Sequence, residues 1–389
     1  MTLPLAAIGR IWPVTVSVML AMLGMGIPLP VIPVFVHDRL GYGTVLVGMA
    51  VGTQSVVTLL TRQAAGNLCD ARGGRTALLL GCAGSGLSGV IYLLAVELAG
   101  SPVLSLLVLL LGRAVMGAAE GLIITGGLVW GMARVRPELA GQAMAWNGAA
   151  FFAALALGAP VGVVLSDLGG FALVSVASCL VPLIGLGVVG GQAAIAGVGG
   201  RRAPVWRVIR WVLVPGSALG LTGVGFGCVA AFLVLDFASH GWAGGGLTLG
   251  IYGAAYVVPR MLFGGVPDRA TGPLAALGVI GIEMVGQVLL WRAAAPGVAM
   301  VGAALTGFGL SLVFPLLGVP MMRRIPPANR GAAIGAYNAF MDLSLGLAGP
   351  VAGLVAGFAG IELVFALGAG CAAASVPLVV ATYRQVPVG

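Results

Sequence analysis

The sequence has few charged residues for its length, and it contains no lysine. Only 8% of its 389 residues are charged, and all 19 basic residues are arginine. An ordinary soluble domain carries roughly 25% charged residues, so this chain cannot build a water-soluble surface. Hydrophobic residues make up 60% of the chain, and its mean hydropathy is +1.12. Most of the surface must therefore face lipid.

Signatures of enzymes and of nucleotide or metal sites are also absent. The sequence has no phosphate-binding GxxxxGK[ST] loop, no HExxH motif and no cluster of metal ligands. We therefore expect no enzyme, no metal site and no cofactor. Its five cysteines include no CxxC pair, which predicts no disulfide framework. The net charge of +8 does not indicate a nucleic-acid partner, because the arginines punctuate apolar runs instead of clustering on one soluble face.

What the sequence does contain is a series of apolar segments, each about as long as the roughly 20 residues that a spanning helix needs. The runs are continuous rather than alternating, which predicts helices and not a β-barrel. The first is too long for the apolar part of a signal peptide, so we expect it to stay as a spanning helix. The segments lie near residues 12–36, 45–65, 76–96, 104–133, 140–165, 170–192, 211–235, 246–264, 274–293, 298–322, 332–356 and 362–383.

Arginine placement predicts the orientation of the chain. With the N-terminus inside, Arg39 and Arg292 lie on the outer side, and Arg113 lies within a helix. The other 16 of the 19 arginines then lie on cytoplasmic segments or at cytoplasmic helix ends. Because membrane proteins concentrate arginine and lysine in cytoplasmic loops, we expect both termini to be cytoplasmic.

The second half of the chain repeats residue spacings of the first. Matching positions lie six helices apart, so both copies have the same orientation in the membrane. We therefore predict an N-terminal six-helix bundle over residues 1–192, a cytoplasmic linker over 193–210 and a C-terminal six-helix bundle over 211–389. The matches are Arg62, Gly66 and Asp70 with Arg260, Gly264 and Asp268 (268 − 70 = 198), and Gly141 and Asn147 with Gly331 and Asn338 (331 − 141 = 190).

A polar segment after the second predicted helix carries the clearest motif. The run from Gly66 to Arg75, GNLCDARGGR, resembles the signature loop of the major facilitator superfamily, G-x-L-x-D-R-x-G-R-R, with Ala71 and Gly74 in place of two basic residues. An aspartate at a helix end can pair with arginines or with a neighbouring helix N-terminus. We predict a cytoplasmic gate there, with an ordinary solvated turn as the alternative. Its residues are Gly66, Asp70, Arg72, Gly73 and Arg75, and Asp268 and Arg269 in the second half.

Four ionisable residues within predicted helices are candidates for proton coupling. Arg113 and Glu120 are seven residues apart, hence on one helix face, but about 10 Å apart along the axis. Glu283 and Asp342 lie in the ninth and eleventh predicted helices. Such residues are costly in a membrane, and desolvation favours a neutral carboxyl group, as a proton carrier requires. We favour Asp342 as the coupling acid, and a permanent structural role is the alternative for each residue.

Uncharged polar residues within the predicted helices are candidates for solute binding. Gln54, Asn147, Tyr337 and Asn338 could hydrogen-bond a solute, or they could satisfy backbone groups where helices break. The two histidines, His37 and His240, fall near the outer ends of the first and seventh predicted helices. We interpret them as solvated loop residues, with sensing of external pH as the alternative.

Further stretches resemble the bacterial arabinose-efflux-like exporters of the same superfamily. They are Leu29–Pro33 (LPVIP), Leu60–Gly66 (LTRQAAG), and Ser311–Pro315 (SLVFP) together with Arg330–Tyr337 (RGAAIGAY). The resemblance implies an all-α membrane protein with 12 transmembrane helices in two pseudo-symmetric six-helix bundles, the major facilitator fold. The run from Arg113 to Gly117 also resembles the R-x-x-x-G motif of the fourth helix, which the family associates with proton coupling.

The same resemblance implies a function. It indicates a secondary active transporter, a proton-coupled antiporter that exports a small organic solute (a sugar, a drug or a secreted metallophore) by alternating access. A proton-coupled importer on this fold, and a lipid-handling or receptor protein, remain alternatives. We expect a monomer in the bacterial inner membrane, with a small-molecule solute, protons and the lipid bilayer as partners and no nucleic acid.

Overall fold

The fold is all-helical over the part of the chain that the computed structural model describes. That part comprises residues 5–135, 140–193, 205–263, 267, 272–325 and 330–384, without the side chains of 5–8, 10, 70, 140–145, 205, 261, 330 and 331. The chain forms two compact units. Unit 1 comprises residues 1–42 and 53–199, and unit 2 comprises residues 43–52 and 200–389. Each unit is described by itself below.

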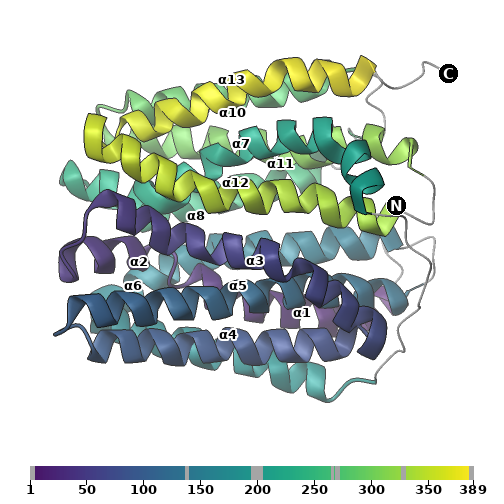
Figure 1. The fold of residues 1–389 in the computed structure, drawn as a ribbon, viewed down its shortest axis with the longest axis horizontal. Coiled ribbons are helices and arrows are strands. Elements are labelled where there is room, and N and C mark those ends of the chain that lie inside the picture. Colours follow the sequence, from purple (N-terminus) through teal and green to yellow (C-terminus); the bar gives the residue numbers. More distant parts are fainter. Residues whose placement is uncertain are drawn as a thin grey trace. The chain divides into compact units, whose positions relative to one another are not determined.

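Unit 1 is built from long helices that pack along their lengths (Figure 1). Within it α4 lies against α5 and α6, and α1 lies against α6. The helix α3 contributes its first turns to unit 2 and its remainder to unit 1. The elements are α1 (Leu5–Gly26), α2 (Val31–Val34), the π-helical turn η1 (Phe35–Arg39), α3 (Thr44–Arg72), α4 (Gly74–Glu97), α5 (Pro102–Ala133) and α6 (Ala140–Gly190).

Glycine and proline decide where the helices of unit 1 are interrupted. The segment expected over residues 12–36 is found as one candidate span, Ile11–Arg39, but its helix is interrupted, because α1 ends at Gly26 and α2 starts at Val31. Pro28 and Pro30 lie in this break, and proline can neither donate a backbone hydrogen bond nor fit inside a regular helix. Farther along, α6 joins the two helices expected over 140–165 and 170–192 across a kink at Gly169 and Gly170. Gly170 has φ of 63° and ψ of −166°, a conformation that favours glycine.

The segment with the signature motif is mostly helical rather than a loop. Helix α3 continues to Arg72 and α4 begins at Gly74, so one residue separates the two helices. That residue, Gly73, has φ of +81°. Because only glycine adopts this region without strain, the motif needs glycine at this position. The segment between the second and third predicted helices is therefore a tight corner between two helices.

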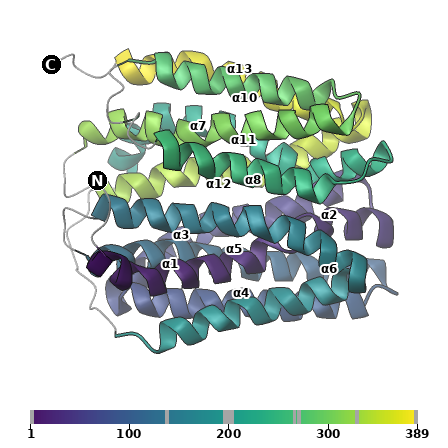
Figure 2. The ribbon, with the colours of Figure 1, turned by 180° about the vertical axis from the view of Figure 1, so that it is seen from behind.

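Unit 2 has the same kind of architecture (Figure 2). Its helix α7 packs against both α12 and α13, α11 packs against α8, and α10 packs against α11 and α13. Because α7 begins at Val205, the last residues of the predicted linker are helical. The elements are α7 (Val205–Ser239), α8 (Gly245–Phe263), α10 (Leu274–Trp291), α11 (Pro296–Arg323), α12 (Arg330–Ala359) and α13 (Leu363–Arg384).

The two units repeat one contact at corresponding positions. In unit 1, Arg134 follows α5 and donates a hydrogen bond of 2.9 Å to the Gln192 side chain, just after α6. In unit 2, Arg324 follows α11 and donates to the carbonyl oxygen of Thr382 near the end of α13. The two arginines are 190 residues apart (324 − 134 = 190), which is the offset of the sequence repeat between Gly141 and Gly331.

Hydrophobic side chains on the outside of the helices match a lipid environment. Leu60 is 74% exposed and Phe358 is 90% exposed, whereas Val18 and Leu316 lie in the cores of their units. Among the described residues, ten helices are long and apolar enough to cross a membrane. That number counts 146–190 as one span and omits α8, so it agrees with a protein of ten to twelve spans.

Candidate functional site

Unit 1 contains a buried carboxylate that a neighbouring helix holds. Glu120 lies in α5 and is 8% exposed. Its Oε2 atom accepts a hydrogen bond of 2.8 Å from Nε2 of Gln54 and lies 3.1 Å from the hydroxyl of Thr58, both in α3. The Thr58 hydroxyl is also within hydrogen-bond distance of the carbonyl oxygens of Gln54 and Gly117. The single hydroxyl hydrogen of Thr58 therefore has three possible acceptors, whereas the Gln54 amide donates to Glu120.

A glycine allows the close approach that this contact needs. Gly117 lies one turn before Glu120, and a Cβ atom there would collide with the backbone carbonyl oxygen of Gln54. The R-x-x-x-G motif therefore brings α5 against α3 at the level of the carboxylate. Among the described residues, Oε1 of Gln54 has no hydrogen-bond partner. The amide can thus present a donor or an acceptor to Glu120 by turning over.

Arg113 and Glu120 interact with different neighbours, although they share a helix. Arg113 is 2% exposed, and its guanidinium lies beside the hydroxyl of Tyr92 in α4. Glu120 interacts with α3 instead. The expectation that the two residues are too far apart to pair directly agrees with this arrangement. The helix therefore carries a positive and a negative side chain two turns apart, and each has its own partner.

Unit 2 contains a second buried polar cluster. Glu283 and Gln287 are one turn apart in α10, and both are fully buried. A Cβ atom on Gly225 of α7 would lie 2.7 Å from Nε2 of Gln287 and 3.1 Å from Oε1 of Glu283, so glycine leaves room for both side chains. Among the described residues, neither side chain nor the Tyr252 hydroxyl has a hydrogen-bond partner. An unpaired charge would be costly at such a site.

The other predicted solute and coupling residues are divided between the units. Asn147 lies in α6 of unit 1, where its Oδ1 faces Gly127 and has no hydrogen-bond partner among the described residues. Asn338, Tyr337 and Asp342 lie in α12 of unit 2, and Asp342 is 8% exposed. The Tyr337 hydroxyl donates a hydrogen bond of 3.1 Å to the carbonyl oxygen of Phe314. This hydroxyl therefore has a structural partner.

The structure describes only some of the predicted gate residues. Arg75 donates to the carbonyl oxygens of Val189 and Gly190, at 3.3 and 2.8 Å, and so caps the C-terminal end of α6 within its own unit. Arg72 is exposed, and a Cβ atom on Gly66 would meet nothing within 4 Å. The side chain of Asp70, and Asp268 and Arg269 altogether, lie outside the described residues.

Some chemically important residues were not expected from the sequence. Thr58 is one, because its contact with Glu120 depends on packing between helices. In α8, the Arg260 side chain stacks on Tyr256 and donates to its hydroxyl at 2.8 Å and to the carbonyl oxygen of Ser311 at 3.1 Å. Tyr252, Tyr256 and Arg260 follow at intervals of four residues, a one-face helical pattern that could have revealed this cluster.

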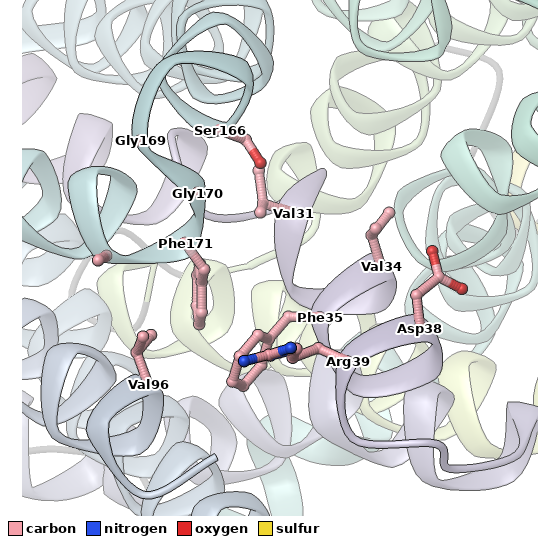
Figure 3. Close-up of a pocket in the computed structure, with 11 residues that line it drawn as sticks. Val31, Val34, Phe35, Asp38, Arg39, Val96, Ser166, Gly169, Gly170 and Phe171 are labelled. Atoms are coloured by element: carbon pink, nitrogen blue, oxygen red, sulfur yellow. The ribbon is translucent and has the colours of Figure 1, made fainter. Parts of the chain in front are cut away.

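A cavity of about 320 Å³ lies in unit 1 away from these polar clusters (Figure 3). Phe35 and Phe171 line it with ring centroids 4.7 Å apart, next to the kink at Gly169 and Gly170. In Figure 3 the Asp38 carboxylate points away from Phe171. None of the predicted site residues lines this cavity. It is therefore separate from the Glu120 site.

Comparison with known proteins gives consistent results. The family model described as Major Facilitator Superfamily matches residues 14–282. An uncharacterized MFS-type transporter of Salmonella typhimurium is 40% identical over 375 residues, which is 96% of each chain. Another, from Pseudomonas aeruginosa strain PAO1, is 41% identical over 363 residues, covering 93% of this chain and 90% of the relative.

Two solved structures share the fold at low sequence identity. A D-xylose–proton symporter aligns with a TM-score of 0.75 and 16% identity over 95% of this chain and 97% of its own. The human organic anion transporter MFSD10 aligns with a TM-score of 0.69 and 17% identity over 97% and 100% of the two chains. The family match and the relatives at 40% identity show that the chain belongs to the major facilitator superfamily, as a multi-pass secondary transporter.

Proposed function

We propose that the protein is a proton-coupled antiporter that exports a small organic solute, like the arabinose-efflux-like exporters that its sequence resembles. The contact of Glu120 with Gln54 and Thr58 carries this proposal. A proton carrier needs a carboxyl group that is shielded from water and can be stabilised in two protonation states. The site around Glu120 meets both requirements within unit 1.

The Gln54 amide can hydrogen-bond to Glu120 in both of its protonation states. In the ionised state of Glu120, the amide N–H would donate to the carboxylate, an arrangement that the 2.8 Å contact supports. In the protonated state, the carboxyl O–H could instead donate to Oε1 of Gln54, which has no other partner among the described residues. The proton therefore moves between bulk water and Glu120 while the two helices stay in contact.

Helix α3 has residues in both units, so a change in the protonation state of Glu120 can affect the conformation of the chain. Gln54 is the second residue of α3 that belongs to unit 1, and residues 43–52 of the same helix belong to unit 2. In this part of α3, the Thr44 hydroxyl donates a hydrogen bond of 2.8 Å to the carbonyl oxygen of Gly353 in α12. A Cβ atom on Gly48 would collide with Gly349 of the same helix. We propose that the predicted bundles, 1–192 and 211–389, rock during alternating access, and that the Glu120 contact biases this motion.

Asp342, which the sequence favours as the coupling acid, is proposed to carry protons together with Glu120. It is buried in α12, one turn after Asn338. We propose that Gln54, Asn147, Tyr337 and Asn338 are within the solute pathway. A buried arginine, Arg113, and few acids favour a neutral or anionic solute.

The experiment is solute-stimulated proton flux in proteoliposomes, measured with a panel of sugars, drugs and metal-chelating metabolites. We expect at least one solute to drive protons in the opposite direction in the wild-type protein. Asp342→Asn should abolish this flux, whereas Glu97→Gln, which changes an exposed acid in unit 1, should retain it. Solute transport without proton movement would refute the coupling, and movement of both in one direction would identify a symporter.

A further inference from the structure

His240 lies between two carboxylates at the end of unit 2 where α7 meets α8. The residue follows the last turn of α7, and its ring is 28% exposed. Its Nδ1 lies 3.7 Å from Oδ1 of Asp236, and its Nε2 lies 3.4 Å from Oε1 of Glu362. In the described part of the chain, these are the charged groups within ion-pair distance of the ring. Glu362 is in the connection between α12 and α13, so the ring bridges two separate connections of the unit.

The hydrogen bond at Nδ1 of His240 determines which ring nitrogen must gain a proton to form the bridge to Glu362. Nδ1 lies 2.9 Å from the backbone carbonyl oxygen of Asp236, which can only accept, so Nδ1 must carry a hydrogen. In the neutral ring Nε2 then has a lone pair and faces a carboxylate oxygen of Glu362, and the two repel. In the charged ring Nε2 also carries a hydrogen and can donate it to Glu362. The bridge to Glu362 is therefore formed by a second proton.

Two further groups lie against the ring. The imidazole stacks on Trp242 with ring centroids 4.4 Å apart, and a cation over an indole is stabilised by the ring's π electrons. Asp236 is 2% exposed, and its Oδ1 has no hydrogen-bond partner among the described residues. The protonated ring of His240 would place a positive charge 3.7 Å from this oxygen.

We propose that His240, Asp236 and Glu362 form a proton-binding clasp, in which a proton taken up at Nε2 of His240 ties the end of α7 to the connection between α12 and α13. The arginine distribution assigns this end of the helices to the external face. The clasp therefore makes one end of unit 2 more rigid when the external solution is acidic. Its role in the transport cycle rests on the proton-coupled function proposed above, but its protonation does not.

The test is hydrogen exchange followed by mass spectrometry on the full-length protein in lipid nanodiscs, with no solute. Rates for peptides that cover residues 236–244 and 361–368 are divided by the rates of the unfolded peptides at the same pH. We expect mildly acidic solution to slow this normalised exchange by about 1.5- to 5-fold relative to mildly alkaline solution, as a partly exposed ion pair allows.

Three variants identify the cause. Glu362→Gln and His240→Gln should abolish the acid-dependent protection. The Glu362 side chain is 59% exposed, so the first variant should fold normally. His37→Gln should retain the protection, because His37 is the chain's other histidine and contacts the Tyr42 carbonyl oxygen instead. Equal acid-dependent protection in wild type and Glu362→Gln would overturn the proposal, as would its absence in wild type. A failure of proton-coupled transport in the proteoliposome assay would leave this result unaffected.

Discussion

The contact between Gln54 and Glu120 should have a coupling energy larger than that of a neutral side-chain hydrogen bond. The perturbation is a double-mutant cycle of Gln54→Ala and Glu120→Ala. Hydrogen bonds to charged groups contribute about 1.5–3 kcal/mol, whereas neutral side-chain bonds within membrane proteins average about 0.6 kcal/mol. The donor and acceptor atoms are 2.8 Å apart and buried, so we predict about 1.5–3 kcal/mol under mildly alkaline conditions.

The assay is reversible unfolding in mixed detergent micelles, applied to wild type, both single variants and the double variant. Each single variant also leaves a cavity, and the cycle subtracts that contribution. A control cycle on Gln63 and Asn67 tests an exposed neutral bond of 3.0 Å in the same helix, for which we expect about 0.2–0.5 kcal/mol. A Gln54–Glu120 coupling no larger than the control would contradict the prediction that this buried hydrogen bond is stronger than an exposed neutral one.

Three other variants test separate parts of the structure. Gly48→Val should lower the free energy of unfolding by about 1–3 kcal/mol in thermal unfolding, because even a Cβ atom would collide with the Gly349 carbonyl oxygen. Gly66→Ala is the control, because a Cβ atom there meets nothing within 4 Å. Equal losses in the two variants would contradict this prediction. Glu283→Gln should change stability by less than about 1 kcal/mol, because a neutral amide replaces a carboxyl group at a site where charge is costly, and failure to fold would disprove this. Arg75→Gln should speed hydrogen exchange at the C-terminal end of α6, because the hydrogen bonds from Arg75 to the carbonyl oxygens of Val189 and Gly190 are lost. Unchanged exchange rates would argue against capping by Arg75.

Much of the fold was predictable because membrane helices need long apolar runs. The sequence predicts an all-α membrane protein of the major facilitator superfamily, and the family match and structural comparisons confirm that fold. The repeat offset of 190 also reappears in the contacts of Arg134 and Arg324. These features depend on local composition and periodicity, which a single sequence displays directly.

Helix boundaries were less predictable, because polar residues do not by themselves end a helix. Residues 66–72 include the polar residues Asn67, Asp70 and Arg72 and lie between the second and third predicted helices, but they contain no proline, so α3 continues to Arg72. Gly73 ends the helix instead, through its positive φ. Conversely, the apolar run over 12–36 hides the break at Pro28 and Pro30, because hydropathy alone does not show a missing backbone donor.

The site was predictable only at the level of residue types. Glu120 and Gln54 were candidates, but their contact across two helices depends on packing at Gly117, which no local pattern reveals. Asp236 was missed because it lies at the end of a long apolar run and resembled an ordinary helix end. Its partner Glu362 is 126 residues away in the sequence (362 − 236 = 126), so their shared contact with His240 is visible only in the folded chain.

The central claim is that Glu120 couples proton movement to solute movement. Its most direct test is to compare Glu120→Gln with Glu97→Gln in proteoliposomes that carry the solute found to drive protons in the wild-type protein. We predict that Glu120→Gln loses solute-driven proton flux while the protein stays folded, and that Glu97→Gln retains it. Wild-type proton flux in Glu120→Gln would contradict the claim and leave Asp342 as the coupling acid.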